Sequence, residues 1–421
     1  MWFLNTLTYS LEERFHHRNI PEYAILSHTW GDEEVSFHEM REGIDEYQLK
    51  AGYQKIKKCC DIAAKAGIQF AWVDTCCIDK RHSTELSEAL NSMYNYYLNA
   101  RECYIYLTDV PTDKGGSSHS RSEQLKSVES SRWFTRGWTL QELIASSRRT
   151  FYSQDWVPIP IDGELMTLIA NITGIQLDLL RGQERLSKYC IATRMSWVSR
   201  RTTTRPEDMA YCLMGIFNVS MPILYGEGLK KAFLRLQTEI MKFSFDQSIF
   251  IWRGSYGSSG LLANFPSDFT NTPNTLRLWA PTNLAPTTMT NVGLHARLLL
   301  CNAPERFLRM DESQRLAAVQ CDILWNDGTW KAPFVLLVLL SDVHCVLNGQ
   351  KCKAYRRIAC GELPIFDKSL LDDGYWEDAL VLQNDQYSLI NHSIIDHGTR
   401  YRRGPNHTFH THTRQDNKSH L

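Results

Sequence analysis

Short apolar runs alternate with stretches of helical periodicity over the first 160 residues of the chain. The apolar runs have the length of buried strands and lie at residues 23–27, 70–74, 103–107 and 150–157. Residues 52–66 and 85–99 repeat apolar side chains at intervals of three and four, and a further helix is predicted at 138–145. Strands that alternate with helices predict a parallel sheet covered by helices and joined by right-handed crossovers.

The pattern changes twice more along the chain. Residues 1–160 are predicted to form the core of an α/β domain, and 161–245 a helical extension with no separate chemistry. Residues 246–395 carry short apolar runs separated by turn residues, which predicts a mostly β C-terminal module. Residues 396–421 are polar and are predicted to be a disordered tail.

Three shorter stretches have distinct local patterns. The polar stretch 111–131 contains a Gly-Gly-Ser-Ser run and is predicted to be a loop. Residues 208–217 are predicted to form one helix. The apolar run 248–252 is predicted to be the first strand of the C-terminal module.

Composition excludes several classes of protein. An apolar fraction of 43% with a formal net charge of -1 excludes disorder over the whole length. The balance of 46 basic and 47 acidic residues gives no field for nucleic acid, so no nucleic-acid partner is predicted. The longest apolar run, 333–340, falls far short of the roughly 20 residues of a bilayer helix, so no membrane segment is predicted.

Cysteine usage predicts reduced thiols. The 12 cysteines show no framework spacing and the N-terminus lacks a secretory signal, so a cytoplasmic protein is expected. The nearest approach to a metal-binding pattern is His344, Cys345, Cys352 and Cys360. Their spacing matches no common zinc module, so neither a metal nor a resident cofactor is expected.

Polar residues come directly after the carboxyl ends of the predicted strands. A parallel sheet binds its ligands at this edge. Ser27 and Gly31 lie at the end of the first strand, Asp74 and Cys77 at the end of the second, and Arg136–Leu143 before the fourth. Neither a GxGxxG fingerprint nor a P-loop is present, so a nucleotide would be held in another way. Cys77 is compatible with a nucleophile, but no local pattern indicates a lowered thiol pKa, and a buried thiol is the alternative.

The other polar and aromatic residues at this edge also have structural interpretations. Glu142 stands three residues after Thr139, which is the spacing of a capping box. Trp30 and Trp138 would equally fill space under loops, and Asp74 would equally serve a turn.

Three blocks of sequence resemble a fungal heterokaryon incompatibility (HET) domain. They are Tyr23–Asp32, Phe70–Asp79 and Phe134–Leu143, and the resemblance extends over about residues 20–160. Residues 196–252 are similar to the usual continuation of such proteins. The resemblance implies self/non-self recognition and programmed cell death, with self-association of the domain and an unknown incompatibility partner protein.

HET domains in turn resemble TIR domains, which implies a TIR-like, flavodoxin-like fold for the first 160 residues. The Trp138-x-x-x-Glu142 spacing matches the TIR pattern, although Thr139 stands where TIR domains often have Cys. The resemblance makes Glu142 the catalytic carboxylate for cleavage of the nicotinamide–ribose bond, with NAD as substrate. Trp30 or Trp138 would stack on a base, and Arg136 would meet the pyrophosphate. The remaining residues of the predicted substrate site are Ser27, Gly31, Asp74 and Cys77.

The resemblance leaves two classes of function open. The first is an NAD glycohydrolase that acts as a death effector, because a carboxylate stabilises an oxocarbenium-like ribose. The second is a non-enzymatic TIR-like adaptor that works through homotypic contacts, since one fold serves both uses. Glu142 separates the two, because an effector needs this carboxylate in an open pocket and an adaptor can use it as a helix cap.

Overall fold

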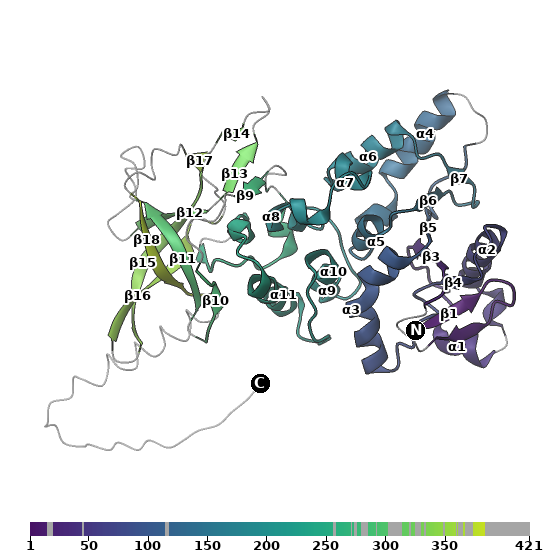
Figure 1. Ribbon diagram of the computed structural model, residues 1–421, viewed down its shortest axis with the longest axis horizontal. Helices are drawn as coiled ribbons and strands as arrows, with labels where there is room; N and C mark the ends of the chain where they lie inside the picture. The colour runs from purple at the N-terminus through teal and green to yellow at the C-terminus, as the bar shows by residue number, and fades with distance from the viewer. Residues whose placement is uncertain are drawn as a thin grey trace, which may run out of the picture.

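The computed structural model of the chain describes nearly all of the first 255 residues and a series of shorter segments beyond them. The described residues are 1–14, 20–43, 46–113, 118–255, 258–270, 272, 276–278, 285–291, 293–301, 314–319, 321–324, 330–331, 334–347, 350–358, 360, 365–366 and 374–383. The predicted tail at 396–421 lies outside them. An N-terminal sheet with its helices, a group of helices and a C-terminal sheet follow one another along the longest axis (Figure 1).

Seven strands form the N-terminal sheet in the order β2–β1–β4–β3–β5–β6–β7. Their bounds are β1 Trp2–Asn5, β2 Leu11–Glu13, β3 Tyr23–His28, β4 Phe70–Trp72, β5 Glu102–Tyr106, β6 Arg149–Tyr152 and β7 Pro158–Ile159. The four central strands, β4, β3, β5 and β6, pair in parallel, as the alternating pattern predicts.

The sheet is mixed rather than wholly parallel, which corrects the sequence-based prediction at its two edges. β1 pairs antiparallel with β2 and β4, and β7 pairs antiparallel with β6. The connections at 6–10 and 153–157 are too short for a parallel crossover, which takes a dozen or more residues. Each edge therefore closes as a hairpin.

Strand β3 is the centre of this sheet. All six of its residues are buried, and Ile25 pairs with Trp72 of β4 on one side and with Cys103 of β5 on the other. A strand covered on both faces needs apolar side chains at successive positions. This explains why Tyr23–Leu26 is a continuous apolar run.

Helices cover the sheet and supply its crossovers. α1 (Phe37–Glu42) and α2 (Ala51–Lys65) lie between β3 and β4, and α3 (Ser83–Asn99) lies between β4 and β5. α5 (Thr139–Ala145) precedes β6. The helices predicted at 52–66, 85–99 and 138–145 are thus confirmed with small shifts of their ends.

Helix α4 (Ser118–Glu129) occupies most of the stretch predicted to be a loop. Its sequence carries few apolar residues, and Val128 is the fully buried one. Polar contacts hold it instead: Gln124 Nε2 donates to Pro111 O at 3.3 Å, and Arg121 Nη2 donates to Asp162 Oδ2 at 2.8 Å. The prediction was wrong because an apolar stripe, the signal it relied on, is almost absent here.

The middle of the chain is helical, as predicted. It contains α6 Gly163–Thr173, α7 Leu177–Leu180, α8 Ile191–Ser196, α9 Asp208–Tyr211, α10 Met214–Phe217 and α11 Leu229–Phe243. The single helix predicted at 208–217 is split into α9 and α10, because Leu213 N donates to Ala210 O at 3.1 Å in a tighter turn.

The run predicted as the first strand of the C-terminal module is mostly a 3₁₀ helix, η4 (Gln247–Phe250). Asp246 Oδ1 accepts the amide of Ser248 at 2.8 Å and Oδ2 accepts that of Ile191 at 2.7 Å. A carboxylate that caps a turn in this way favours helical over extended backbone. The prediction failed because it weighed the apolar residues and not the capping residue before them.

Among the described residues, the C-terminal sheet comprises eight strands, which pair antiparallel except for β16 with β18. Its members are β8 Ser258–Ser259, β10 Thr288–Met289, β11 Leu294–Cys301, β12 Gln314–Val319, β15 Phe334–Leu347, β16 Gln350–Ile358, β17 Ile365–Phe366 and β18 Tyr375–Val381. β9 (Leu276–Leu278), β13 (Cys321–Leu324) and β14 (Trp330–Lys331) form a small separate sheet.

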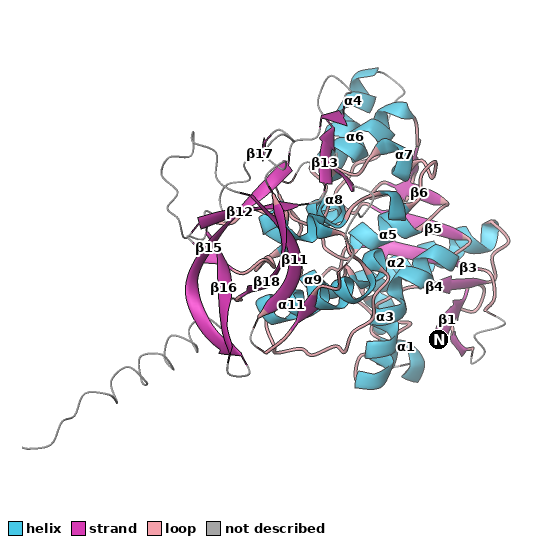
Figure 2. Cartoon of the chain, turned by 60° about the vertical axis from the view of Figure 1, so that its left-hand side comes forward, coloured by secondary structure: helices cyan, strands magenta, loops and turns pink. Residues whose placement is uncertain are grey.

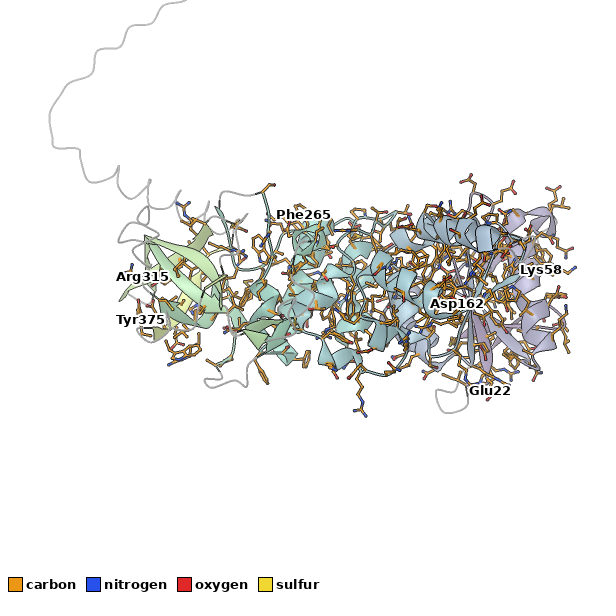
Figure 3. The ribbon with its side chains drawn as sticks, turned by 90° about the horizontal axis from the view of Figure 1, so that it is seen from above. Glu22, Lys58, Asp162, Phe265, Arg315 and Tyr375 are labelled. Atoms are coloured by element: carbon orange, nitrogen blue, oxygen red, sulfur yellow. The ribbon has the colours of Figure 1, made fainter. Side chains whose placement is uncertain are left out.

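A buried arginine joins the C-terminal sheet to the helices. Arg357 of β16 donates to Phe250 O at 3.1 Å and to Trp252 O at 2.6 Å, and its guanidinium lies 3.9 Å from the centre of the Trp252 ring. The helical segment lies between the two sheets (Figure 2). Seen from above, Lys58 and Glu22 lie at one end of the molecule and Arg315 and Tyr375 at the other (Figure 3).

No helix among the described residues combines the length and the apolarity needed to cross a bilayer.

Helix α10 packs closely on α3 at a glycine, which generates a stability prediction. A Cβ built on Gly215 would lie 2.1 Å from Cβ of Tyr94. Gly215→Ala should therefore force the two helices apart and lower the free energy of unfolding by about 1–3 kcal/mol in urea denaturation. Gly163→Ala is the matched control, because no atom lies within 4 Å of its built Cβ. Equal stability of the two variants would contradict the close packing.

Candidate functional site

A cavity of about 240 Å³ lies at the carboxyl ends of β3 and β4. Strand ends, α3, the start of α5 and the helical segment all contribute to its walls. Its lining residues are His28, Thr29, Trp30, Asp74, Ile78, Lys80, Leu86, Leu90, Met93, Tyr97, Arg136, Trp138, Thr139, Glu142, Thr204, Arg205, Asp208 and Tyr225. Polar groups that the sequence places after separate strands therefore meet in one cavity.

Glu142 projects from α5 into this cavity and is only 7% exposed. The Ser27 hydroxyl at the end of β3 donates to Glu142 Oε2. Trp133 Nε1 in turn donates to Ser27 Oγ at 2.9 Å. A buried chain of hydrogen bonds thus fixes the orientation of the carboxyl group relative to the central strand.

Burial raises the pKa of Glu142 to about 8, because a charged carboxylate loses its hydration there. The hydrogen bond from Ser27 acts in the opposite direction, and the charge of Asp74 raises the pKa further. Tyr97 and the buried cation of Arg201 also favour the ionised form, with smaller effects. The carboxyl group is therefore mostly protonated at pH 7 in the unliganded protein.

The capping-box interpretation of Glu142 does not hold. The N-cap of α5 is Trp138, which makes no side-chain capping bond. The Thr139 hydroxyl donates to Trp133 O at 2.6 Å and to Arg136 O at 2.9 Å instead of accepting an amide of the first turn. The Glu142 side chain is directed to Ser27 and not back to the start of its own helix.

Two clusters with the same arrangement of an aromatic residue, an aspartate and a cation lie in the cavity wall. In the strand-end cluster, Trp30 Nε1 donates to Asp74 Oδ2 at 2.8 Å, and Lys80 Nζ lies 3.8 Å from the centre of the Trp30 ring.

In the helix-side cluster, the Tyr225 hydroxyl donates to Asp208 Oδ1 at 2.9 Å, and the Arg205 guanidinium lies 4.0 Å from the centre of the Tyr225 ring. In each cluster, an aromatic side chain donates a hydrogen bond to a carboxyl group, and a cation lies on the face of its ring. Burial raises the pKa of both Asp74 and Asp208.

His28 also lines the cavity. Its imidazole makes no hydrogen bond with the described residues. Neither ring nitrogen has a hydrogen-bond partner there, and Nε2 lies 3.8 Å from Glu34 Oε2 and 4.0 Å from Asp74 Oδ1. Burial, with the nearby cations Lys55 and Lys80, lowers the pKa of His28 well below its usual value. A neutral imidazole offers one donor and one acceptor, and buried polar groups are rarely left unsatisfied.

Arg201, from the helical segment, holds the start of α5 by hydrogen bonds. This buried guanidinium donates from Nη1 to Arg136 O and to Thr139 Oγ1, each at 2.9 Å. Gly137 N donates to Thr202 O at 2.9 Å, and a Cβ on Gly137 would lie 2.6 Å from Thr203. The turn that carries the predicted catalytic residue is therefore packed against the helical segment.

The structure brings most of the predicted site residues together. Trp30, Asp74, Arg136, Trp138 and Glu142 line the cavity. Arg136 Nη2 donates to Thr204 Oγ1 at 2.9 Å, which directs it along the wall.

The other three predicted residues lie outside the lining. Ser27 is fully buried beneath Glu142, and the Gly31 amide donates to Glu34 Oε1 at 2.7 Å. The thiol of Cys77 accepts the amide of Val73 at 3.4 Å and lines another cavity, of about 670 Å³, beside α3. The buried-thiol alternative for Cys77 describes this placement.

His28, Lys80 and the contribution of the helical segment to the cavity are not among the residues predicted from the sequence. No separate chemistry is predicted at 161–245, and that prediction did not include Arg205, Asp208 and Tyr225, which line the cavity. A signal was present in Arg205-Pro-Glu-Asp208 and Tyr225-Gly-Glu-Gly228, where charged and aromatic residues cluster outside the periodic helical pattern. Periodicity describes only the face that packs, so it does not report such residues.

Among the described residues, no group of three or more His, Cys, Asp or Glu side chains is placed to hold a metal ion.

The raised pKa of Glu142 predicts a pH-dependent stability. The folded protein holds this proton up to about pH 8, whereas an unfolded chain releases it near the ordinary glutamate pKa of 4.5. The stabilising contribution is therefore complete below pH 4.5 and is lost as the pH rises toward 8, at up to about 1.4 kcal/mol per pH unit.

The measurement is urea denaturation of the wild type and of Glu142→Gln at pH 5 to 8. The free energy of unfolding of the wild type should fall relative to that of the variant across this range. Parallel curves for the two proteins would show that the carboxyl group is ionised throughout.

Two family models match the chain. The model described as heterokaryon incompatibility protein (HET) matches residues 23–127, from β3 into α4, and Glu142 lies beyond its last matched residue. A second, described as a domain of unknown function (DUF8212), matches residues 231–321. This second match crosses the predicted domain boundary between residues 245 and 246.

A relative with a known name supports the first match. Over 225 residues, 53% of this chain, the sequence is 50% identical to the vegetative incompatibility protein HET-E-1 of Podospora anserina. The aligned region makes up 16% of that relative's own length, and no solved structure gives a significant match. The HET match and this identity therefore support a HET domain of fungal type in the N-terminal part of the chain.

Proposed function

We propose that the protein acts in heterokaryon incompatibility as a cell-death effector that cleaves NAD at its nicotinamide–ribose bond. The name of the relative, of which the chain covers 16%, supports the biological role. The proposed NAD cleavage rests on the location of Glu142. Its buried carboxyl group lies in the wall of a cavity at the carboxyl ends of parallel strands.

A TIR-like fold for residues 1–160 belongs to the same proposal. The parallel strands stand in the order β4–β3–β5–β6, so the second parallel strand in the chain comes first and the first comes second. The same beginning, 2-1-3-4, is found in flavodoxin-like doubly wound sheets. The Trp138-x-x-x-Glu142 pair at the start of α5 adds the sequence likeness to TIR domains.

The reaction suits the groups in the cavity. The bond between C1′ of the ribose and the pyridinium nitrogen breaks, its electron pair leaves with nicotinamide, and the ribose becomes oxocarbenium-like. Nicotinamide departs neutral, so no general acid is needed, and water then adds at C1′ and releases a proton. An ionised Glu142 would stabilise the cation and accept that proton.

Bound NAD would itself favour the ionised form of Glu142. A pyridinium cation next to a buried carboxyl group lowers the pKa of that group. Ser27 already donates to Glu142 and would hold the ionised carboxylate in place. Trp30 or Trp138 would stack on a base and Arg136 would meet the pyrophosphate, with self-association in the cytoplasm as the activating step.

A non-enzymatic adaptor function is the second candidate, and the burial of the Glu142 side chain favours it. A carboxyl group that is 7% exposed and joined to the central strand through Ser27 also serves to fix α5 on the sheet. In that case the helix would present a homotypic contact surface and no NAD would be consumed.

The test is nicotinamide release by the purified full-length chain, at high concentration to permit assembly. The wild type should release nicotinamide from NAD, and Glu142→Gln should lower kcat by about 100-fold or more, because one preorganised charge is lost at the transition state.

The matched control is Glu129→Gln, which removes an exposed carboxyl group of α4 and should leave the rate unchanged. Circular dichroism would show that each variant is folded. If the folded, assembled wild type released no nicotinamide from NAD, the enzymatic proposal would be rejected in favour of the adaptor function.

The pH dependence of the reaction gives a further prediction. Since the active form carries ionised Glu142, kcat/KM should rise about tenfold per pH unit and level off above the pKa of about 8. Steady-state kinetics from pH 6 to 9 would measure this profile. A profile that is flat across this range would exclude Glu142 as the titrating group.

A further inference from the structure

Lys80 and Arg205 are the cations of the two aromatic clusters. Each lies on a ring face, and among the described residues neither makes an ion pair with a carboxylate within 4.0 Å. The carboxyl groups of the two clusters, Asp74 and Asp208, accept hydrogen bonds from Trp30 and Tyr225. Both cations therefore keep donors for a ligand.

The charge of the cavity lining favours an anion. Lys80, Arg136 and Arg205 are its cations, and Asp74, Asp208 and Glu142 its carboxyl groups. While Glu142 is protonated, before any pyridinium cation binds, these three cations face two carboxylates. His28 adds no charge, because burial keeps its imidazole neutral.

The position of the two cations also fits an anion at the entrance. Trp30, whose ring face Lys80 contacts, is 48% exposed, whereas Glu142 is 7% exposed. A cavity of about 240 Å³ is smaller than the roughly 300–1,000 Å³ of sites that enclose a whole ligand. A ligand that reaches Glu142 therefore leaves part of itself at the level of the two clusters.

We propose that Lys80 and Arg205 together bind the phosphate groups of a nucleotide, with one cation supplied by the strand-end cluster and one by the helix-side cluster. This proposal rests on the proposed function for the enclosed part of the ligand and adds the site of its phosphates. It makes the site composite, since Arg205 lies outside the HET match at 23–127. Arginine and lysine are the usual phosphate-binding side chains.

The helix-side cluster is preorganised for this role. Glu207 Oε1 accepts the amides of Gly226 and Gly228, each at 2.9 Å, and both glycines have the positive φ that this loop requires. Tyr211 accepts the Leu224 amide at 2.9 Å. Tyr225 is thus held in place on a fixed loop, and Arg205 meets a ligand without a closing motion.

The test is isothermal titration calorimetry of the full-length chain with ADP-ribose, which carries a pyrophosphate and no nicotinamide. Arg205→Gln and Lys80→Gln should each weaken its binding about tenfold, since each removes one charge-assisted contact. Arg205→Lys, which keeps the charge, should weaken it less. Inorganic pyrophosphate should compete with ADP-ribose, and adenosine should bind the wild type and the variants alike.

The matched controls are Arg200→Gln and Lys58→Gln, two exposed cations outside the cavity lining. Lys58 lies at the N-terminal end of the molecule (Figure 3). Equal ADP-ribose affinity in the wild type and both cavity variants would overturn the proposal, as would no binding by the wild type. Weakened binding without any nicotinamide release from NAD would retain the phosphate site and reject the NAD-cleaving function.

Discussion

The complete burial of β3 is the constraint on which the rest of the site depends. Because this strand has neighbours on both sides and is covered on both faces, polar groups for a ligand come from its ends, and open α/β sheets bind ligands at the carboxyl end. Ser27 and His28 lie at that end, and Trp30 follows. The hydrogen bonds from Trp133 to Ser27 and from Ser27 to Glu142 then fix α5 relative to the sheet.

The same burial determines the electrostatics of the site. Excluding water raises the pKa of Glu142, Asp74 and Asp208 and lowers that of His28, so all four groups shift toward their neutral forms. Burial also lowers the pKa of Lys80, and Lys80 and Arg205 each lie on the face of an aromatic ring. Perturbed titratable groups gathered in one cavity are typical of functional sites.

Local patterns predicted the regular elements well and the polar ones poorly. The strands β3 to β6 and the helices α2, α3 and α5 follow from apolar runs and periodicity. Helix α4 and the 3₁₀ turn at 247–250 do not, because they are held by Gln124 and Asp246 through hydrogen bonds. Side-chain capping and polar packing depend on partners elsewhere in the chain, which a local window does not contain.

The sequence by itself determined the parallel core, the group of polar residues at its carboxyl edge and the HET resemblance, because each depends on residues close together in the chain. Trp30, Asp74, Arg136, Trp138 and Glu142 were found in this way. Only the tertiary structure decided that Glu142 bonds to Ser27 across 115 positions and does not cap its own helix. Only the tertiary structure brought Arg205, Asp208 and Tyr225 into the same cavity. The helical segment contacts α3 through α10 and α5 through Arg201, and these long-range contacts are not encoded by any local pattern.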